Sequence, residues 1–170
     1  MGLTWGPFML TQERLKQVLH YDPSSGKWTW LKTRCWKAKM GDEAGCPNER
    51  GYINIGLFGQ LYSASRLAHF YMTGNWPKFE LDHINRNPSD NRWENLRQAT
   101  RVENSANTRT KVNNTSGYKG VHFSKKDGKY MVRIRHNGKR LYLGEFKCPE
   151  LAGLVYAEHA AKFHGEFFTT

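Results

Sequence analysis

The sequence predicts an α+β fold built from two modules, and three observations lead to this prediction. Short segments that alternate apolar and polar residues, such as Tyr52 to Leu57, stand among segments with helical periodicity. A polar stretch without apolar periodicity, residues 106–116, interrupts the 170-residue chain and is expected to be a linker. Beyond it, Asn137-Gly138 is typical of a two-residue hairpin turn. We therefore expect modules at residues 1–105 and 117–170.

The first module is expected to begin with a helix over residues 12–20, for which Thr11 is the N-cap. A turn and a short strand over residues 27–31 follow. Residues 52–57 and 61–64 are expected to pair as strands. A helix over residues 65–73 should end at Gly74, since glycine readily adopts the left-handed backbone of a helix C-terminus.

The second module shows three strand patterns, at residues 120–124, 130–136 and 139–145. A helix over residues 149–164 follows, with Pro149 in its first turn and Gly165 at its end. This order predicts a three-stranded antiparallel sheet packed on one helix.

Charge and composition limit the classes of protein. There are 26 Lys and Arg against 15 Asp and Glu, a net charge of +11. Residues 117–147 hold 9 of these basic residues and 2 acidic ones, net +7, which indicates a surface that binds a polyanion. The sequence contains no 18-residue apolar run and no secretory signal, and its three cysteines lack metal-ligand spacing. We expect a cytoplasmic protein, with no membrane contact and no obligate protein partner.

The most informative segment runs from Leu81 to residue 104. Asp82-His83 ends a short apolar strand, and a polar loop follows in which Asp90 and Asn91 are expected to shape the turn. Asn95 opens a second short strand. Thr100 and Glu103 form a capping box that starts a helix, one turn into which lies Asn104. The predicted strand, loop, strand and helix can bring Asp82, His83, Asn95 and Asn104 together.

These residue types suit metal-assisted hydrolysis of a phosphodiester. A carboxylate and an amide oxygen are hard ligands for Mg²⁺, which keeps several waters and accepts phosphate oxygens. A neutral histidine can take a proton from the attacking water, and an amide carbonyl can fix the tautomer of its ring.

The spacing of these four residues resembles that of the HNH endonucleases, also called His-Me finger or ββα-metal nucleases. Upstream segments such as Gly51-Tyr52-Ile53 and Gly74-Asn75-Trp76-Pro77 look like the lead-in of bacteriophage-type HNH homing endonucleases, so the resemblance covers about residues 10–110. It implies that His83 is the general base, that Asn95 orients it, and that Asp82 and Asn104 bind the metal. The implied cofactor is one Mg²⁺ or Mn²⁺ ion, and the implied products carry a 5′-phosphate and a 3′-hydroxyl.

The second module resembles the plant ethylene-response-factor (AP-two) DNA-binding domain. The resemblance rests on Ser116 to Val121, on Gly138 to Phe146 and on the Ala-rich helix. It implies that the sheet lies in the major groove of double-stranded DNA with the helix behind it. The DNA-facing set that it implies is Lys119, His122, Ser124, Lys126, Arg133, Arg135, Arg140 and Tyr142. Arg101 is either a further phosphate contact or a solvated side chain. Several of these positions differ from the plant domain, so its recognition sequence does not carry over.

We therefore expect a site-directed DNA endonuclease, a phage homing enzyme acting in the bacterial host, whose first module cuts and whose second helps to choose the site. The alternative is a non-catalytic DNA-binding regulator with a decayed nuclease core. RNA binding is disfavoured because no RNA-recognition signature is present. A basic stretch with Lys32, Arg34, Lys37 and Lys39 is either a further contact to the DNA backbone or a solvated loop.

Overall fold

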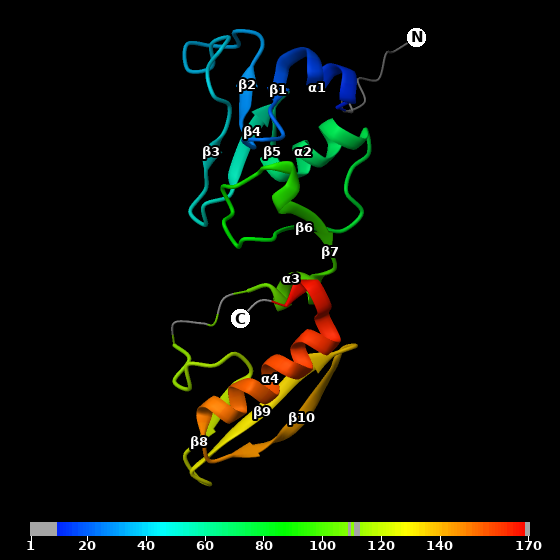
Figure 1. Ribbon diagram of the computed structural model, residues 1–170. Coiled ribbons are helices and arrows are strands. Elements are labelled where there is room, and N and C mark those ends of the chain that lie inside the picture. Colours follow the sequence, from blue (N-terminus) through cyan, green and yellow to red (C-terminus); the bar gives the residue numbers. More distant parts are fainter. Residues whose placement is uncertain (1–9, 109, 111–112, 169–170) are drawn as a thin grey trace, which may run out of the picture. The chain divides into compact units, whose positions relative to one another are not determined.

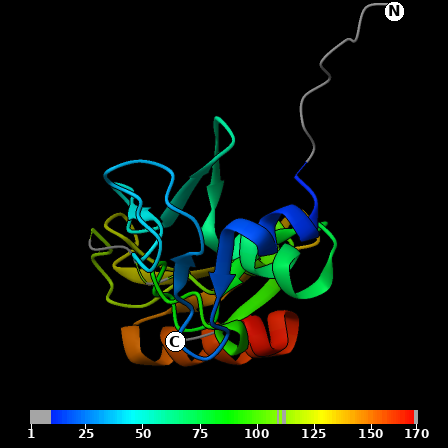
Figure 2. The ribbon, with the colours of Figure 1, turned by 90° about the horizontal axis from the view of Figure 1, so that it is seen from above.

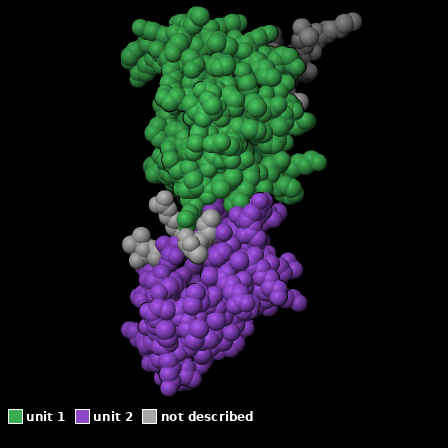
Figure 3. All heavy atoms as spheres, in the orientation of Figure 1, with its two compact units in different colours: residues 1–99 green, residues 100–170 purple. Residues whose placement is uncertain are grey.

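The computed structural model describes residues 10–108, 110 and 113–168 (Figure 1). Contacts between residues divide the chain into two compact units, residues 1–99 and residues 100–170, which Figure 3 shows in green and purple. Each unit is described by itself below.

The first unit begins with α1 (Gln12–Val18), where the Thr11 side chain accepts a hydrogen bond from the Arg14 backbone as expected. The helix stops at Val18, two residues earlier than predicted, because the chain turns into strand β1 (Leu19–Tyr21). That strand pairs antiparallel with β2 (Trp28–Trp30), and both present their buried side chains to one core.

A second sheet has the order β3-β4-β5, formed by β3 (Cys46–Pro47), β4 (Ile53–Leu57) and β5 (Gln60–Ser63). The helix α2 (Ala64–Thr73) follows β5 directly and ends at Gly74, whose φ of 74° is the left-handed conformation predicted for it. Helices α1 and α2 contact each other (Figure 2).

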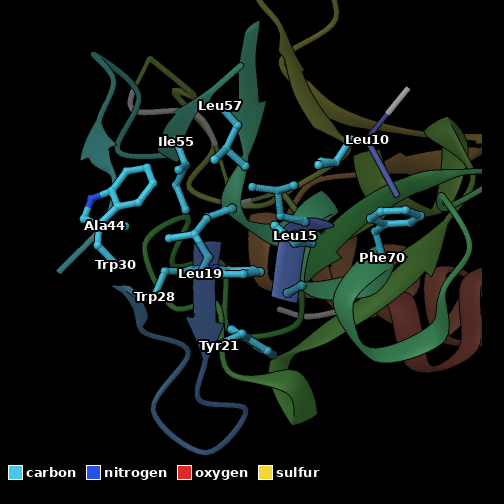
Figure 4. Packing of buried hydrophobic residues seen from close by; sticks show 13 residues of the cluster. Leu10, Leu15, Leu19, Tyr21, Trp28, Trp30, Ala44, Ile55, Leu57 and Phe70 are labelled. Atoms are coloured by element: carbon cyan, nitrogen blue, oxygen red, sulfur yellow. The ribbon is translucent and has the colours of Figure 1, made fainter. Parts of the chain in front are cut away.

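The core of the first unit joins these elements (Figure 4). Trp28 and Tyr21 are its largest fully buried side chains, with their ring centroids 4.8 Å apart. Around them pack aliphatic residues from both helices, from β1 and from β4, namely Leu15, Leu67, Leu19, Ile55 and Leu57. This core holds the scaffold to which the next hairpin is attached.

That hairpin consists of β6 (Glu80–His83) and β7 (Leu96–Ala99), which pair antiparallel with Asp82 opposite Arg97 and His83 opposite Leu96. The connection contains a single 3₁₀ turn, η1 (Trp93–Asn95). Both strands were predicted, although Asn95 belongs to the 3₁₀ turn and not to the second strand.

The second unit contains the predicted antiparallel sheet, in the order β10-β9-β8. Its strands are β8 (Val121–Ser124), β9 (Lys129–His136) and β10 (Lys139–Phe146), and the turn at Asn137 and Gly138 has positive φ at both residues. Helix α4 (Pro149–His164) contacts all three strands and continues into η2 (Gly165–Phe167). Val121, Val132 and Ala152 form the centre of this core, so the prediction of a three-stranded sheet packed on one helix is confirmed.

The short helix α3 (Arg101–Ala106) starts with the predicted capping box: the Thr100 side chain accepts from the Glu103 backbone, and Glu103 accepts from the Thr100 backbone. Because α3 contacts α4 and η2, the contact boundary lies between Ala99 and Thr100, ahead of the linker expected at 106–116. In the described part of the chain, no helix is both long and apolar enough to cross a membrane.

Candidate active site in the β6–β7 hairpin

His83 is the last residue of β6 and is held inside the protein. Pairing with β7 and a hydrogen bond from the Ile84 backbone to the Asn95 carbonyl fix the strand end (2.9 Å). The His83 side chain is 5% exposed, and the Tyr52 ring lies with its centroid 5.8 Å from the imidazole. The imidazole therefore has a defined position before any substrate arrives.

Asn91 is a hydrogen-bond partner of the imidazole: its Oδ1 lies 3.2 Å from Nε2 of His83. Asn91 directs its other amide atom, Nδ2, to the Ser89 carbonyl at 3.3 Å, which fixes the amide with its oxygen toward the ring. An oxygen is an acceptor, so Nε2 carries the proton and the lone pair of the neutral ring lies on Nδ1. A histidine in this tautomer is suited to accept a proton through Nδ1.

The pKa of His83 is lowered from its ordinary value near 6.5. Burial is the dominant cause, because it penalises the charged ring. The hydrogen bond with Asn91 and the negative charges of Asp82 and Asp90 act in the opposite direction and raise the pKa. The net result favours the neutral form, which is the form that a general base needs.

Asn95, expected to orient the imidazole, has a different set of partners. Its Nδ2 donates to the Asn85 side chain at 3.0 Å and to the Asp90 carbonyl at 2.7 Å, and its Oδ1 accepts from the Asn85 backbone at 3.0 Å. Asn95 thus ties together the two ends of the loop that carries Asn91. The direct contact with His83 belongs to Asn91, which sequence reasoning placed only in the turn.

Asn91 is anchored from a distant part of the chain. The phenol of Tyr21, in β1, donates to the Asn91 carbonyl at 2.6 Å. The backbone of Asn91 and Arg92 also passes against Gly26, where an added Cβ would lie 2.4 Å from backbone atoms. Beside Asn91, a hydrogen bond from the Arg92 side chain lowers the pKa of Asp90 to about 2. No spacing in the sequence links Tyr21 or Gly26 with this loop.

Asp82, the expected metal ligand from the strand, is 4% exposed and forms an ion pair with Arg97 directly across the hairpin. Both Nε and Nη2 of Arg97 lie 2.9 Å from Oδ2 of Asp82. Among the described residues there is no group of three or more His, Cys, Asp and Glu that could hold a metal ion. A carboxylate together with an amide oxygen is still a donor set that fits Mg²⁺ or Mn²⁺, since these ions keep waters and accept phosphate oxygens.

Asn104, the second expected metal ligand, lies in α3, one turn beyond the capping box. It is half-buried, and its backbone N–H bonds the Thr100 carbonyl at 2.9 Å, as the predicted helix requires. Asn104 belongs to the second unit, whereas Asp82 and His83 belong to the first.

The second unit carries a row of exposed cations on the sheet face opposite α4. Val132 and Ile134 of β9 are buried, so the alternating residues Arg133 and Arg135 are exposed on the other face. Arg135 pairs with Arg140 of β10, and Arg133 pairs with Tyr142. His122 and Lys126, also expected to face DNA, are exposed as well.

Two members of the expected DNA-facing set have partners inside the second unit. The ammonium of Lys119 donates to the carbonyls of Ala106, the last residue of α3, and of Thr108. The hydroxyl of Ser124 donates to Asp127 at 2.6 Å in the turn after β8. In this structure these two side chains stabilise the unit itself.

Arg101 lies at a pocket of about 260 Å³ at the end of the sheet. Arg135 of β9 and His164 of α4 line the same pocket. Arg101 is thus close to one of the exposed sheet arginines, although its sequence position is far from the sheet.

Residues 62–106, which contain the β6–β7 hairpin and α3, match the family model of the HNH endonucleases. Protein 3.8 of Escherichia phage T7 is 32% identical over 115 residues, which are 65% of this chain and 93% of that protein.

A solved structure described as DNA binding and cleavage by the HNH homing endonuclease I-HmuI is similar with a TM-score of 0.40 and 22% identity, covering 79% of this chain and 75% of that one. The chain therefore carries an HNH endonuclease domain and belongs to the same family as Protein 3.8 of phage T7.

Proposed function

We propose that this protein is a metal-dependent endonuclease that hydrolyses phosphodiester bonds of double-stranded DNA, with His83 as the general base. The observation that carries the proposal is the buried imidazole at the end of β6, whose Nε2 faces the Asn91 oxygen at 3.2 Å within the segment that matches the HNH endonucleases. Nδ1 of His83 accepts a proton from the water that attacks phosphorus. Asn91 keeps the ring in the productive tautomer, and Asn95 keeps the loop in place.

Asp82 and Asn104 would hold one divalent ion, Mg²⁺ or Mn²⁺. When bound, such an ion offsets the negative charge that grows on the phosphate and on the leaving oxygen. Two Arg97 nitrogens lie 2.9 Å from Oδ2 of Asp82 and hold this carboxylate in a fixed orientation. Hydrolysis with the geometry of the HNH family is expected to leave a 5′-phosphate and a 3′-hydroxyl.

The second unit supports a role in DNA binding, and we assign it as an AP-two-like module. The exposed face formed by Arg133, Arg135, Arg140 and Tyr142 presents three guanidinium groups and an aromatic ring on one side of a sheet. Arginine side chains can contact guanine with two hydrogen bonds or bind phosphate. A nuclease with a second unit that recognises DNA sequence would cut at chosen sites, as homing endonucleases do.

The test is cleavage of supercoiled plasmid and phage DNA by the purified full chain, with Mg²⁺, with Mn²⁺ or with EDTA. The His83→Ala variant should lose cleavage and keep its affinity for DNA. A matched control is His20→Ala, which removes an exposed histidine of the same unit. End-labelling of the products determines which side keeps the phosphate.

Two results would contradict the proposal. Wild-type protein that binds duplex DNA but never cuts it, with either ion, would favour the non-catalytic regulator. Equal cleavage by the His83→Ala variant and the wild type would remove His83 from the reaction.

A further inference from the structure

Residues 32–40 form a small hairpin between β2 and β3, which we call the Trp36 hairpin (Figures 1 and 2). The Ala38 backbone donates to the Cys35 carbonyl at 3.1 Å, and the Arg34 backbone donates to the Ala38 carbonyl at 2.9 Å. These bonds define a tight turn from Cys35 to Ala38 with Trp36 and Lys37 at its tip.

The tip carries a large aromatic side chain in solvent. Trp36 is 77% exposed and Met40 is 70% exposed, whereas Trp28 and Trp30 of the adjacent strand are 1% and 7% exposed. An indole exposed to this degree keeps most of its large apolar surface in solvent, where a partner can contact it. The Lys37 ammonium lies 4.7 Å from the centroid of the Trp36 ring, a local cation–π contact within the turn.

The surroundings of Trp36 are strongly basic. Lys32, Arg34, Lys37 and Lys39 lie within eight residues, and the sequence has no Asp or Glu from Leu31 to Gly41. A partner of the opposite charge, with apolar surfaces that an indole can contact, fits this composition. Duplex DNA has both features, in its phosphates and in its stacked bases and sugars.

The base of the hairpin is rigidly attached while the tip projects. Arg34 donates to the Gly56 carbonyl of β4, and its guanidinium lies 5.1 Å from the Trp30 ring centroid. The backbone of Lys39 donates to the Asp42 carboxylate at 2.9 Å, and that of Met40 donates to the Thr33 hydroxyl at 3.0 Å. A preorganised tip loses little conformational freedom when it binds.

We propose that the Trp36 hairpin is a second DNA-contacting element, located in the nuclease unit and separate from the sheet of residues 121–146. Lys32, Lys37 and Lys39 neutralise phosphates, and Trp36 packs against the bases or sugars of the minor groove. Apolar wedges of this kind partly unstack and bend a duplex. The proposal rests on DNA as the substrate of the proposed nuclease.

The experiment measures binding of the full chain to a fluorescent DNA duplex by anisotropy over a salt series. All variants carry His83→Ala, so that binding is measured without cleavage. Trp36→Ala should weaken binding about 5- to 100-fold with an unchanged salt slope, because loss of one aromatic–base contact has that effect. Trp36→Phe should recover part of the affinity.

The lysines are tested as a set. Joint replacement of Lys32, Lys37 and Lys39 by Gln should make the slope of log K against log salt shallower by about 2 to 3. The matched control replaces three exposed lysines outside the hairpin, Lys16, Lys78 and Lys162, with the same loss of charge. It should change the slope by less than 1.

Three outcomes overturn the proposal: a Trp36→Ala variant that binds within twofold of its parent, a control set that changes the slope as much as the hairpin set, or a Trp36→Ala variant that changes only the oligomeric state in sedimentation. Cleavage by the wild type is measured separately. A protein that binds through the hairpin but does not cut would refute the nuclease assignment and leave this inference intact.

Discussion

Replacement of Asn91 by alanine tests whether this residue positions His83. The substitution removes Oδ1, which lies 3.2 Å from Nε2 of an imidazole that is 5% exposed. The Asn91 backbone carbonyl, which accepts a hydrogen bond from the Tyr21 phenol, is unchanged, so the loop stays attached to β1. The variant therefore removes the contact with the ring and the 3.3 Å hydrogen bond from Nδ2 to the Ser89 carbonyl.

The burial of the contact between Asn91 and His83 determines how much stability and activity the variant should lose. A buried donor left without its acceptor costs about 1–3 kcal/mol of stability, and each kcal/mol corresponds to about 4–8 °C in Tm for a domain of this size. Loss of an oriented partner of a functional histidine typically costs about 10- to 100-fold in activity. We expect that decrease in the cleavage rate, equivalent to about 1.4–2.7 kcal/mol in the barrier.

Single-turnover cleavage of a labelled duplex at saturating protein provides the measurement, with Tm recorded for each variant. The control is Asn75→Ala, which removes an exposed amide of the same unit. Asn91→Asp supplies an acceptor that carries a negative charge and should restore rate only at higher pH, because the charge raises the pKa of His83.

The Asn95→Ala variant distinguishes the role of Asn95 from that of Asn91. It should lower Tm without displacing the pH profile, since its amide bonds Asn85 and Asp90 and not the ring. The reasoning is refuted if Asn91→Ala cuts at the wild-type rate, or if Asn95→Ala moves the pH profile and Asn91→Ala does not.

Three further predictions concern pH, the backbone and charge. Because the pKa of His83 is lowered from its ordinary value near 6.5, the midpoint of the loss of cleavage at acid pH should lie below pH 6.5; a midpoint at or above pH 6.5 would contradict this. Gly26→Ala should lower Tm and cleavage together, since its φ is +73° and its Cβ would meet the Asn91 backbone at 2.4 Å; unchanged Tm in a thermal scan would disprove the clash. Joint replacement of Arg133 and Arg135 by Gln should make the salt dependence of DNA binding shallower by about 2, and an unchanged slope would exclude them as phosphate contacts.

The sequence alone determined the elements whose signals are local. The capping box of Thr100 and Glu103, the stop at Gly74 and the turn at Asn137-Gly138 each depend on neighbouring residues, and each is present in the structure. The strand that ends in Asp82-His83 also followed from its apolar pattern and the polar loop after it. Such features are predictable because a few adjacent backbone and side-chain groups satisfy one another.

The tertiary structure decided which groups meet across the chain. Asn91, and not Asn95, forms the hydrogen bond with the His83 ring. Hydrogen bonds from Tyr21 to Asn91 and from Asn85 to Asn95 fix the loop in this conformation, and no spacing in the sequence reveals them. Lys119 donates to the carbonyls of Ala106, the last residue of α3, and of Thr108, and no spacing in the sequence reveals these partners either. A residue type sets which hydrogen bonds a side chain can make, but only the packed chain sets which partner lies within about 3 Å of it.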